Sequence, residues 1–277
     1  MSGWTTRFPE LARRTLLMGV VNVTPDSFSD GGRYGDKDSA VARAFELVDE
    51  GADILDIGGE STRPGAAPVA LSEELRRVVP VIEAIARRGI SISVDTTKAE
   101  VARAAIEAGA SIINDVSAGG FDPGMLPELA RQDVLVVLMH TRASPKEMQR
   151  GTWTYEGGVV AAVRRALGEA VEHAVALGIP RDHVCVDPGI GFGKTLSENL
   201  ELLRSLRTFA DLGPVLVGTS NKSFLGALTG RPVEERSHAT AASVALSISA
   251  GADIVRVHDI RNMRDAARVA DGFARSG

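Results

Sequence analysis

The sequence has 277 residues, 44% of them hydrophobic and 24% charged, which suits one α/β barrel or two ordinary domains. Its formal net charge of −5 gives no electrostatic basis for binding nucleic acid or an anionic membrane. Cys185 is the single cysteine, which excludes an internal disulfide, and no apolar run approaches the roughly 18 to 20 residues of a spanning helix, so we expect a cytoplasmic protein.

Short apolar runs that end in polar residues recur eight times along the chain. Each is a predicted strand, because such runs are typical of a covered parallel sheet whose polar groups follow where the strand ends. The runs are residues 16–21, 53–59, 90–94, 111–113, 134–139, 183–186, 215–218 and 254–257. Residues 1–15 show no clear period, and we expect them to pack against the bottom of the fold.

Helical periodicity separates these runs. Ser72 is the predicted N-cap of the second helix, and Gly51 is expected to end the first. The helical patterns cover residues 38–49, 72–88, a segment reaching 107, 123–131, 156–177, 197–208, segments reaching 250, and 262–274.

Eight strands that alternate with helices predict a (β/α)8 TIM barrel, with residues 1–277 as one domain. The alternative is a doubly wound Rossmann sheet. That fold places a G-x-G-x-x-G turn after its first strand, whereas Gly31 and Gly32 lie deep in a long loop without this spacing. The barrel is therefore the better prediction.

Polar residues follow most of the predicted strands at their carboxyl ends. In a (β/α)8 barrel these ends share one rim, where active sites are built. Any one of these residues alone is more often a turn former or a helix cap, but the strand beginnings show no matching set. The rim is expected to collect Asn22, Arg63, Asp95, Asn114, His140, Asp187, Lys222, Arg256 and His258.

Two cations of the rim are individually informative. Lys222 begins a predicted helix, where the positive end of the helix dipole disfavours a cation by roughly 0.3 to 1 kcal/mol. Ser220, just before it, is a candidate cap for the same helix. Arg256 lies within an apolar strand and needs an anionic partner or solvent, and its planar fork suits phosphate.

Two other kinds of site are disfavoured by the sequence. Residues 193–195 resemble the end of a P-loop, but the required earlier glycine is replaced by Pro188. The five histidines show neither an i, i+4 helical pair nor a cysteine partner, which argues against zinc. His183 and Cys185 share a predicted strand and are expected to be core residues.

Seven motifs occur in order over residues 18–260: MGVVNVTPDSFSDGG, DIGGESTRPGA, SVDTTKAEV, IINDVSAG, DPGIGFGKT, VGTSNKSFLG and IVRVHDI. Together they resemble the dihydropteroate synthase family and cover nearly the whole chain. The resemblance implies a barrel enzyme, usually a homodimer. It also implies transfer of 6-hydroxymethyl-7,8-dihydropterin from its pyrophosphate to 4-aminobenzoate in folate biosynthesis, with Mg²⁺ as cofactor and sulfonamides as competitors of the aminobenzoate.

The resemblance also implies roles for all of the rim residues except His140, and for several loop residues. Asp95, Lys222 and Arg256 would be catalytic, and Asn22 would be the Mg²⁺ position. Asp95 would stabilise a cationic pterin after the C–O bond ionises. Pterin would contact Asp95, Asn114, Met139, Asp187 and Lys222; pyrophosphate would contact Asn22, Thr62, Arg63, Arg256 and His258; and 4-aminobenzoate would contact Phe28, Pro64, Phe192 and Ser223.

One departure from the family leaves alternatives open. Members usually read S-R-K-S where this chain has residues 220–223 as S-N-K-S, so Asn221 replaces an arginine beside Lys222. A catalytically weak pterin-binding paralogue would fit this change. A pterin-dependent methyltransferase of related fold would also keep the carboxylates, although it has no use for a pyrophosphate clamp.

Overall fold

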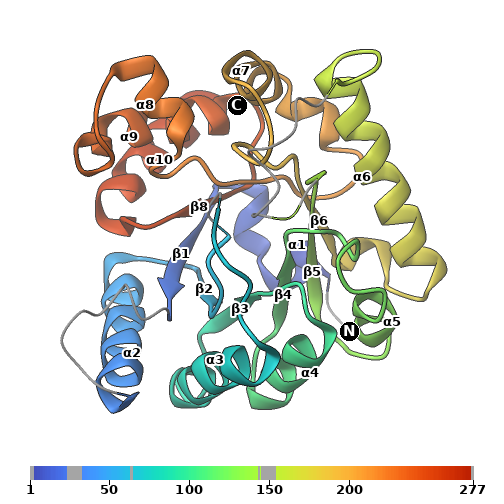
Figure 1. Cartoon of the computed structure of the whole chain (residues 1–277). Helices are drawn as coiled ribbons and strands as arrows, with labels where there is room; N and C mark the ends of the chain where they lie inside the picture. Colours follow the sequence, from blue (N-terminus) through green and yellow to red (C-terminus); the bar gives the residue numbers. More distant parts are fainter. Residues whose placement is uncertain (1–2, 24–32, 63–64, 143, 145–153, 276–277) are drawn as a thin grey trace.

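The computed structural model describes residues 3–23, 33–62, 65–142, 144 and 154–275. Its eight strands form one parallel sheet in the order β6-β5-β4-β3-β2-β1-β8-β7, with helices around it (Figure 1). The sheet curls until its end strands meet, where Val186 N–H donates to the Pro214 carbonyl at 2.9 Å and Val186 bridges Val215. This nearly closed cylinder confirms the predicted (β/α)8 barrel.

The strands lie at or within about two residues of their predicted positions. They are β1 (Leu16–Asn22), β2 (Ile54–Gly58), β3 (Ser91–Asp95), β4 (Ile112–Asp115), β5 (Leu135–Met139), β6 (Val184–Asp187), β7 (Leu216–Val217) and β8 (Ile254–Val257).

Between the strands run α2 (Arg33–Glu50), α3 (Leu71–Ala86), α4 (Ala99–Ala108), α5 (Met125–Leu129), α6 (Val159–Ala176), α7 (Leu196–Arg204), α8 (Ser223–Thr229) and α9 (Ser237–Ser249), and α10 (Ile260–Ala274) follows β8.

Three details of the predicted helices are wrong. Helix α2 begins at Arg33, five residues before the predicted start. Its first five residues, R-Y-G-D-K, show no helical spacing of apolar residues, so the sequence pattern does not reveal them. Ser72 is the second residue of α3, whose N-cap is Ala70 without a side-chain cap. Ser220 does not cap α8 because its hydroxyl pairs with the His258 ring instead, at 2.9 Å.

The core has two parts because successive side chains of a strand point to opposite faces. One cluster fills the space between strands and helices, and the other lies inside the barrel. His183 and Cys185 are both buried, as predicted. The inner cluster consists of Leu16, Met18, Ile54, Ile112, Leu135, Val137, Cys185, Leu216 and Ile254, with Trp4, Phe8 and Leu11 from the N-terminal segment.

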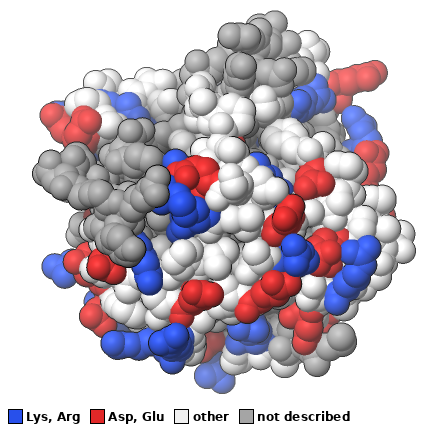
Figure 2. Space-filling model, turned by 60° about the horizontal axis from the view of Figure 1, so that its bottom comes forward, with Lys and Arg blue, Asp and Glu red and all other residues white. Residues whose placement is uncertain are grey.

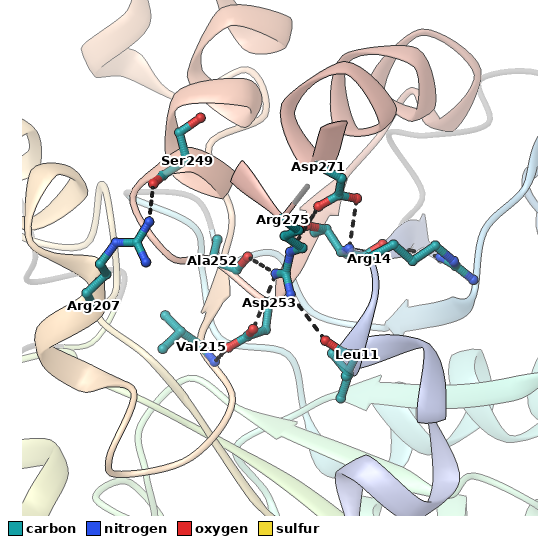
Figure 3. Close-up of polar contacts among 10 residues, drawn as sticks. Leu11, Arg14, Arg207, Val215, Ser249, Ala252, Asp253, Asp271 and Arg275 are labelled. Carbon is teal, nitrogen blue, oxygen red and sulfur yellow. Dashed lines mark hydrogen bonds and ion pairs between the residues drawn. The ribbon is translucent and has the colours of Figure 1, made fainter. Parts of the chain in front are cut away.

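The N-terminal segment closes the lower end of the barrel. Trp4, in α1 (Trp4–Arg7), is fully buried, and its indole N–H donates to the His183 carbonyl at 2.9 Å. Arg275, just after α10, donates to the Leu11 and Ala252 carbonyls at 3.1 Å each, and Asp253 accepts from Val215 N–H at 2.9 Å (Figure 3). These bonds tie both ends of the chain to the starts of β7 and β8.

The molecular surface carries charges of both signs. On the face shown in Figure 2, acidic and basic side chains are interspersed rather than gathered in a patch of one sign. Among the described residues, no helix combines the length and the apolar character needed to cross a membrane.

Candidate active site

The upper end of the barrel interior is polar. Residues two positions apart in a strand point to the same face. On the inward face, β2 changes from apolar Ile54 to polar Asp56, and β8 changes from Ile254 to Arg256. The same step occurs in β4 and β6, so the charged side chains stand directly above the apolar inner core. The polar set comprises Asp56, Asp95, Asn114, Asp187 and Arg256, from five different strands.

The Arg256 guanidinium binds two carboxylates inside the barrel. Its Nε donates to Asp56 Oδ2 at 2.5 Å, and its Nη2 donates to Asp95 Oδ2 at 2.8 Å. Burial alone would lower the pKa of Arg256, but the two carboxylates outweigh it and raise the pKa. The anionic partner that the sequence requires for Arg256 is therefore provided by the protein itself.

Asp95 binds a proton more tightly than an ordinary aspartate does. The side chain is 5% exposed, and burial raises its pKa to about 7, although Arg256 opposes the shift. The Asp56 carboxylate adds to the increase because a second negative charge disfavours ionisation. Asp95 therefore changes its charge near neutral pH.

Asp187 and Lys222 form the second charged pair of the site. Burial raises the pKa of Asp187 and lowers that of Lys222 to about 8, while each charge opposes the shift of the other. Asp187 also accepts from Gly189 N–H at 2.7 Å. The Lys222 ammonium lies 4.5 Å from the centroid of the Phe192 ring and donates to the Ile190 carbonyl. Phe192 thus covers Lys222 from the β6–α7 loop.

Further rim residues surround this centre. Asn22 ends β1 and is half-buried, and Met139 ends β5, where it is buried beside Asp187 in the strand register. Thr62 and Asp95 line one cavity of about 380 Å³, which extends toward the β3–α4 and β4–α5 loops. His258 follows β8, and its Nδ1 shares a hydrogen bond with the Ser220 hydroxyl.

Not every predicted contact falls within this arrangement. Ser223 is the exposed first residue of α8. Phe28, Arg63 and Pro64 lie outside the described residues, so the predicted roles of these three stay predictions. His140 is buried on the rim, and burial lowers its pKa to about 3, which keeps the imidazole neutral.

Two residues near the centre are not among those predicted from the sequence. Asp56 is fully buried and contacts both Arg256 and Asn114; its position two residues after Ile54 on the inward face was the available signal. Lys194 donates to the carbonyls of Gly189 at 2.8 Å and Phe192 at 3.2 Å, and burial lowers its pKa to about 7. Lys194 lies in a loop, neither in a helical pattern nor at the end of a strand, and its partners are backbone atoms. The sequence therefore gives no signal for it.

The sequence profile of the pterin binding enzyme family matches residues 18–258. The dihydropteroate synthase of Bacillus subtilis is 46% identical over 266 residues, which are 95% of this chain and 90% of that protein. The chain belongs to the dihydropteroate synthase family. Its fold agrees, since the Yersinia pestis dihydropteroate synthase, solved with a sulfonamide drug, superposes with a TM-score of 0.89 at 41% identity over 96% of both chains.

A second solved dihydropteroate synthase is similar to this chain to the same degree. The Xanthomonas albilineans enzyme, solved with 4-aminobenzoic acid, superposes with a TM-score of 0.87. It is 46% identical and covers 95% of this chain and 94% of its own. The likeness therefore extends over nearly the whole of both chains.

Proposed function

We propose that this chain is a dihydropteroate synthase that joins 6-hydroxymethyl-7,8-dihydropterin pyrophosphate to 4-aminobenzoate. The observation that carries the proposal is the presence of two buried carboxylates, each beside a half-buried cation, at the mouth of a barrel of this family: Asp95 with Arg256 and Asp187 with Lys222. Sulfonamides, which share the aryl amine of 4-aminobenzoate, are expected to compete for the second substrate.

The polar set suits the edge of a pterin ring. A pterin presents adjacent N–H donors and a carbonyl acceptor, so a carboxylate such as Asp187 accepts from the donors and the Lys222 ammonium donates to the acceptor. Asn114 supplies an amide whose NH2 group donates to Asp56 at 3.1 Å, which leaves its carbonyl oxygen as an acceptor for the ring. Because Asn114 and Asp187 are buried, an incorrect ring edge would leave one of them unpaired, at a cost of about 1 to 3 kcal/mol.

The reaction forms a C–N bond to the amine of 4-aminobenzoate and breaks the C–O bond to pyrophosphate. Positive charge develops on the pterin as the C–O bond ionises, and ionised Asp95 stabilises it electrostatically. Negative charge develops on the departing pyrophosphate, where Arg256 and His258 supply donors. The aryl amine loses its proton to solvent, so the site needs no strong base.

Mg²⁺ is the proposed cofactor, and Asn22 is the residue that would hold it. The amide oxygen of Asn22 is a hard donor of the type that Mg²⁺ prefers, and Mg²⁺ commonly takes its remaining ligands from phosphate and water. Within the described residues no cluster of three or more His, Cys, Asp or Glu side chains provides another metal site. When bound, the ion would neutralise charge on the leaving pyrophosphate.

The deciding experiment is turnover of the pterin pyrophosphate and 4-aminobenzoate, with dihydropteroate and pyrophosphate both quantified. We expect stoichiometric formation of both products and loss of turnover when a chelator removes Mg²⁺. Binding of pterin without turnover would contradict the proposal and identify a catalytically weak paralogue.

A substitution at Asn221 tests the end of the site that is expected to bind 4-aminobenzoate. This residue is exposed with φ +60°, a left-handed conformation that asparagine tolerates better than most residues. Asn221→Arg adds a cation for the aminobenzoate carboxylate and is expected to lower the KM for 4-aminobenzoate by roughly 5- to 30-fold, leaving the pterin KM unchanged. Steady-state kinetics with each substrate varied measures both constants.

Asn221→Gly is the matched control, because glycine keeps the backbone conformation and adds no charge. It is expected to leave the KM for 4-aminobenzoate unchanged. A change in the pterin KM alone in Asn221→Arg would mean that position 221 faces the first substrate.

We propose that the chain forms a homodimer through α9 and α10, which pack against each other. Three large apolar side chains on these helices are exposed: Leu246 by 70%, Val269 by 60% and Phe273 by 85%. Phe273→Asp is expected to raise the dimer dissociation constant by about 30-fold or more, as for a buried aromatic anchor. Analytical ultracentrifugation measures the effect, and Leu177→Asp, an exposed leucine after α6, is the control that should leave dimerisation unchanged.

A further inference from the structure

Asp56 is a fully buried carboxylate in the middle of β2. Burying an ionised carboxylate is costly unless donors compensate it. Its Oδ2 accepts from Arg256 Nε at 2.5 Å and from Asn114 Nδ2 at 3.1 Å. Its Oδ1 is buried without a hydrogen-bond partner among the described residues. One oxygen atom therefore holds two side chains of the site.

The two partners of Asp56 come from opposite sides of β2. In the sheet order β4-β3-β2-β1-β8, Asn114 on β4 and Arg256 on β8 are each two strands away from Asp56. Neither contact follows from the pairing of neighbouring strands. Asp56 instead reaches across the barrel interior. It links Asn114 to Arg256, whose strands β4 and β8 are not paired with each other.

The contact with Asn114 also fixes the orientation of its amide. An ionised carboxylate only accepts hydrogen bonds, so the side of the amide that faces Asp56 must be the NH2 group. The Asn114 carbonyl oxygen is then turned away from Asp56. In this orientation the amide presents an acceptor, rather than a donor, to an N–H group of a ligand in the barrel mouth.

We propose that Asp56 is a positioning residue, which orients the Asn114 amide as an acceptor for the pterin edge and holds the Arg256 guanidinium beside Asp95. This inference rests on the proposed function, because it assigns the roles of Asn114 and Arg256 toward that substrate. Asp56 itself acts through these two side chains.

Binding of pteroic acid by calorimetry tests the Asn114 part. Asp56→Ala removes the acceptor and is expected to weaken binding by about 10-fold or more, whereas Asp56→Asn restores a carbonyl oxygen and is expected to recover most of the affinity. The double variant Asp56→Ala/Asn114→Ala should bind no more weakly than Asn114→Ala alone, because residues that act together are non-additive.

Ser93→Ala is the matched control for these variants. Ser93 is the register partner of Asp56 on β3, is equally buried, and has a hydroxyl without a hydrogen bond among the described residues. Its removal should leave pteroic acid binding and kcat unchanged. Wild-type affinity in Asp56→Ala, or additive losses in the double variant, would overturn the Asn114 part.

The pH profile of Asp56→Asn tests the Arg256 part and does not require Asp56→Ala to fold. Asp95 faces Arg256 from β8, Asp56 from β2, Glu74 from α3 and Asp115 from β4. Asp56→Asn keeps an acceptor for Arg256 but removes the negative charge that raises the pKa of Asp95, so the acid limb of kcat/KM should move to lower pH. An unchanged acid limb would overturn this part.

The test separates the inference from the proposed function. A wild-type chain that binds pteroic acid without turnover would refute the proposed function, and the calorimetric comparison would still decide the role of Asp56. A wild-type chain that turns over while every Asp56 variant matches it would refute the inference alone.

Discussion

Asp95→Asn is expected to lower turnover at least about 10²-fold, the scale of losing one preorganised electrostatic group. The amide keeps the shape of the side chain, but it cannot offset positive charge on an ionising pterin. It also leaves Arg256 with Asp56 as its one remaining carboxylate partner from the described pair. Single-turnover kinetics at saturating substrate measure the chemical step directly, and unchanged kinetics would remove Asp95 from the mechanism.

The pKa of Asp95 gives this prediction a pH dependence. Only the ionised carboxylate is active, and burial raises its pKa to about 7, so kcat/KM should fall as the pH drops below 7. Asp95→Asn should lack this acid limb. The same shift affects the stability of the fold. The pKa of Asp95 is about 7 in the folded state and 3.8 for an ordinary aspartate, so the folded state binds the proton more tightly. The contribution of Asp95 to the free energy of unfolding therefore declines as the pH rises from 3.8 through about 7.

Asp115→Asn is the control for Asp95→Asn. Asp115 ends the neighbouring strand β4 and is equally buried, with a raised pKa, but it accepts from Ser117 and Gly119 in the β4–α5 loop. Its loss should lower thermal stability and keep the acid limb of kcat/KM, moved only slightly to lower pH, because Asp115 raises the pKa of Asp95 less than Asp56 or Glu74 does. Loss of the limb in both variants would show that it reports folding rather than the charge of Asp95.

The fold class follows from the sequence because a parallel barrel strand needs an apolar run that ends at a polar rim. Helix starts are less predictable: Ser72 looks like a cap, yet the Ala70 carbonyl already accepts from Glu73 and Glu74. Tertiary contacts, not local sequence, decide such cases. Ser220 shows the same effect, because its hydroxyl is taken by His258 from a distant strand.

The residues of the site also fall into those that the sequence predicts and those that it does not. Asp95 and Asp187 are visible in the sequence because they end apolar runs and belong to motifs of the family. Asp56 lies inside its run, and its importance depends on partners 58 and 200 residues away. Lys194 depends on loop carbonyls. Position on a strand is thus predictable, whereas the choice of partner across the barrel requires coordinates.

Gly189→Ala is expected to lower the free energy of unfolding by roughly 2 to 4 kcal/mol and to abolish pterin binding. Gly189 has φ +71°, where an alanine costs about 1 to 2 kcal/mol, and its Cβ would lie 2.0 Å from the His140 carbonyl oxygen. The loop must shift to relieve this overlap. That movement breaks the hydrogen bond from Gly189 N–H to Asp187 and the one from Lys194 to the Gly189 carbonyl.

Gly178→Ala separates the two causes of this loss, because Gly178 has φ +109° but no atom within 4 Å of a Cβ placed there. It suffers the left-handed strain without the overlap, so urea denaturation should show a loss of about 1 kcal/mol and calorimetry should show wild-type pterin binding. Equal destabilisation of the two variants would mean that backbone strain alone sets the effect. Wild-type binding in Gly189→Ala would mean that Asp187 does not depend on the β6–α7 loop for its position.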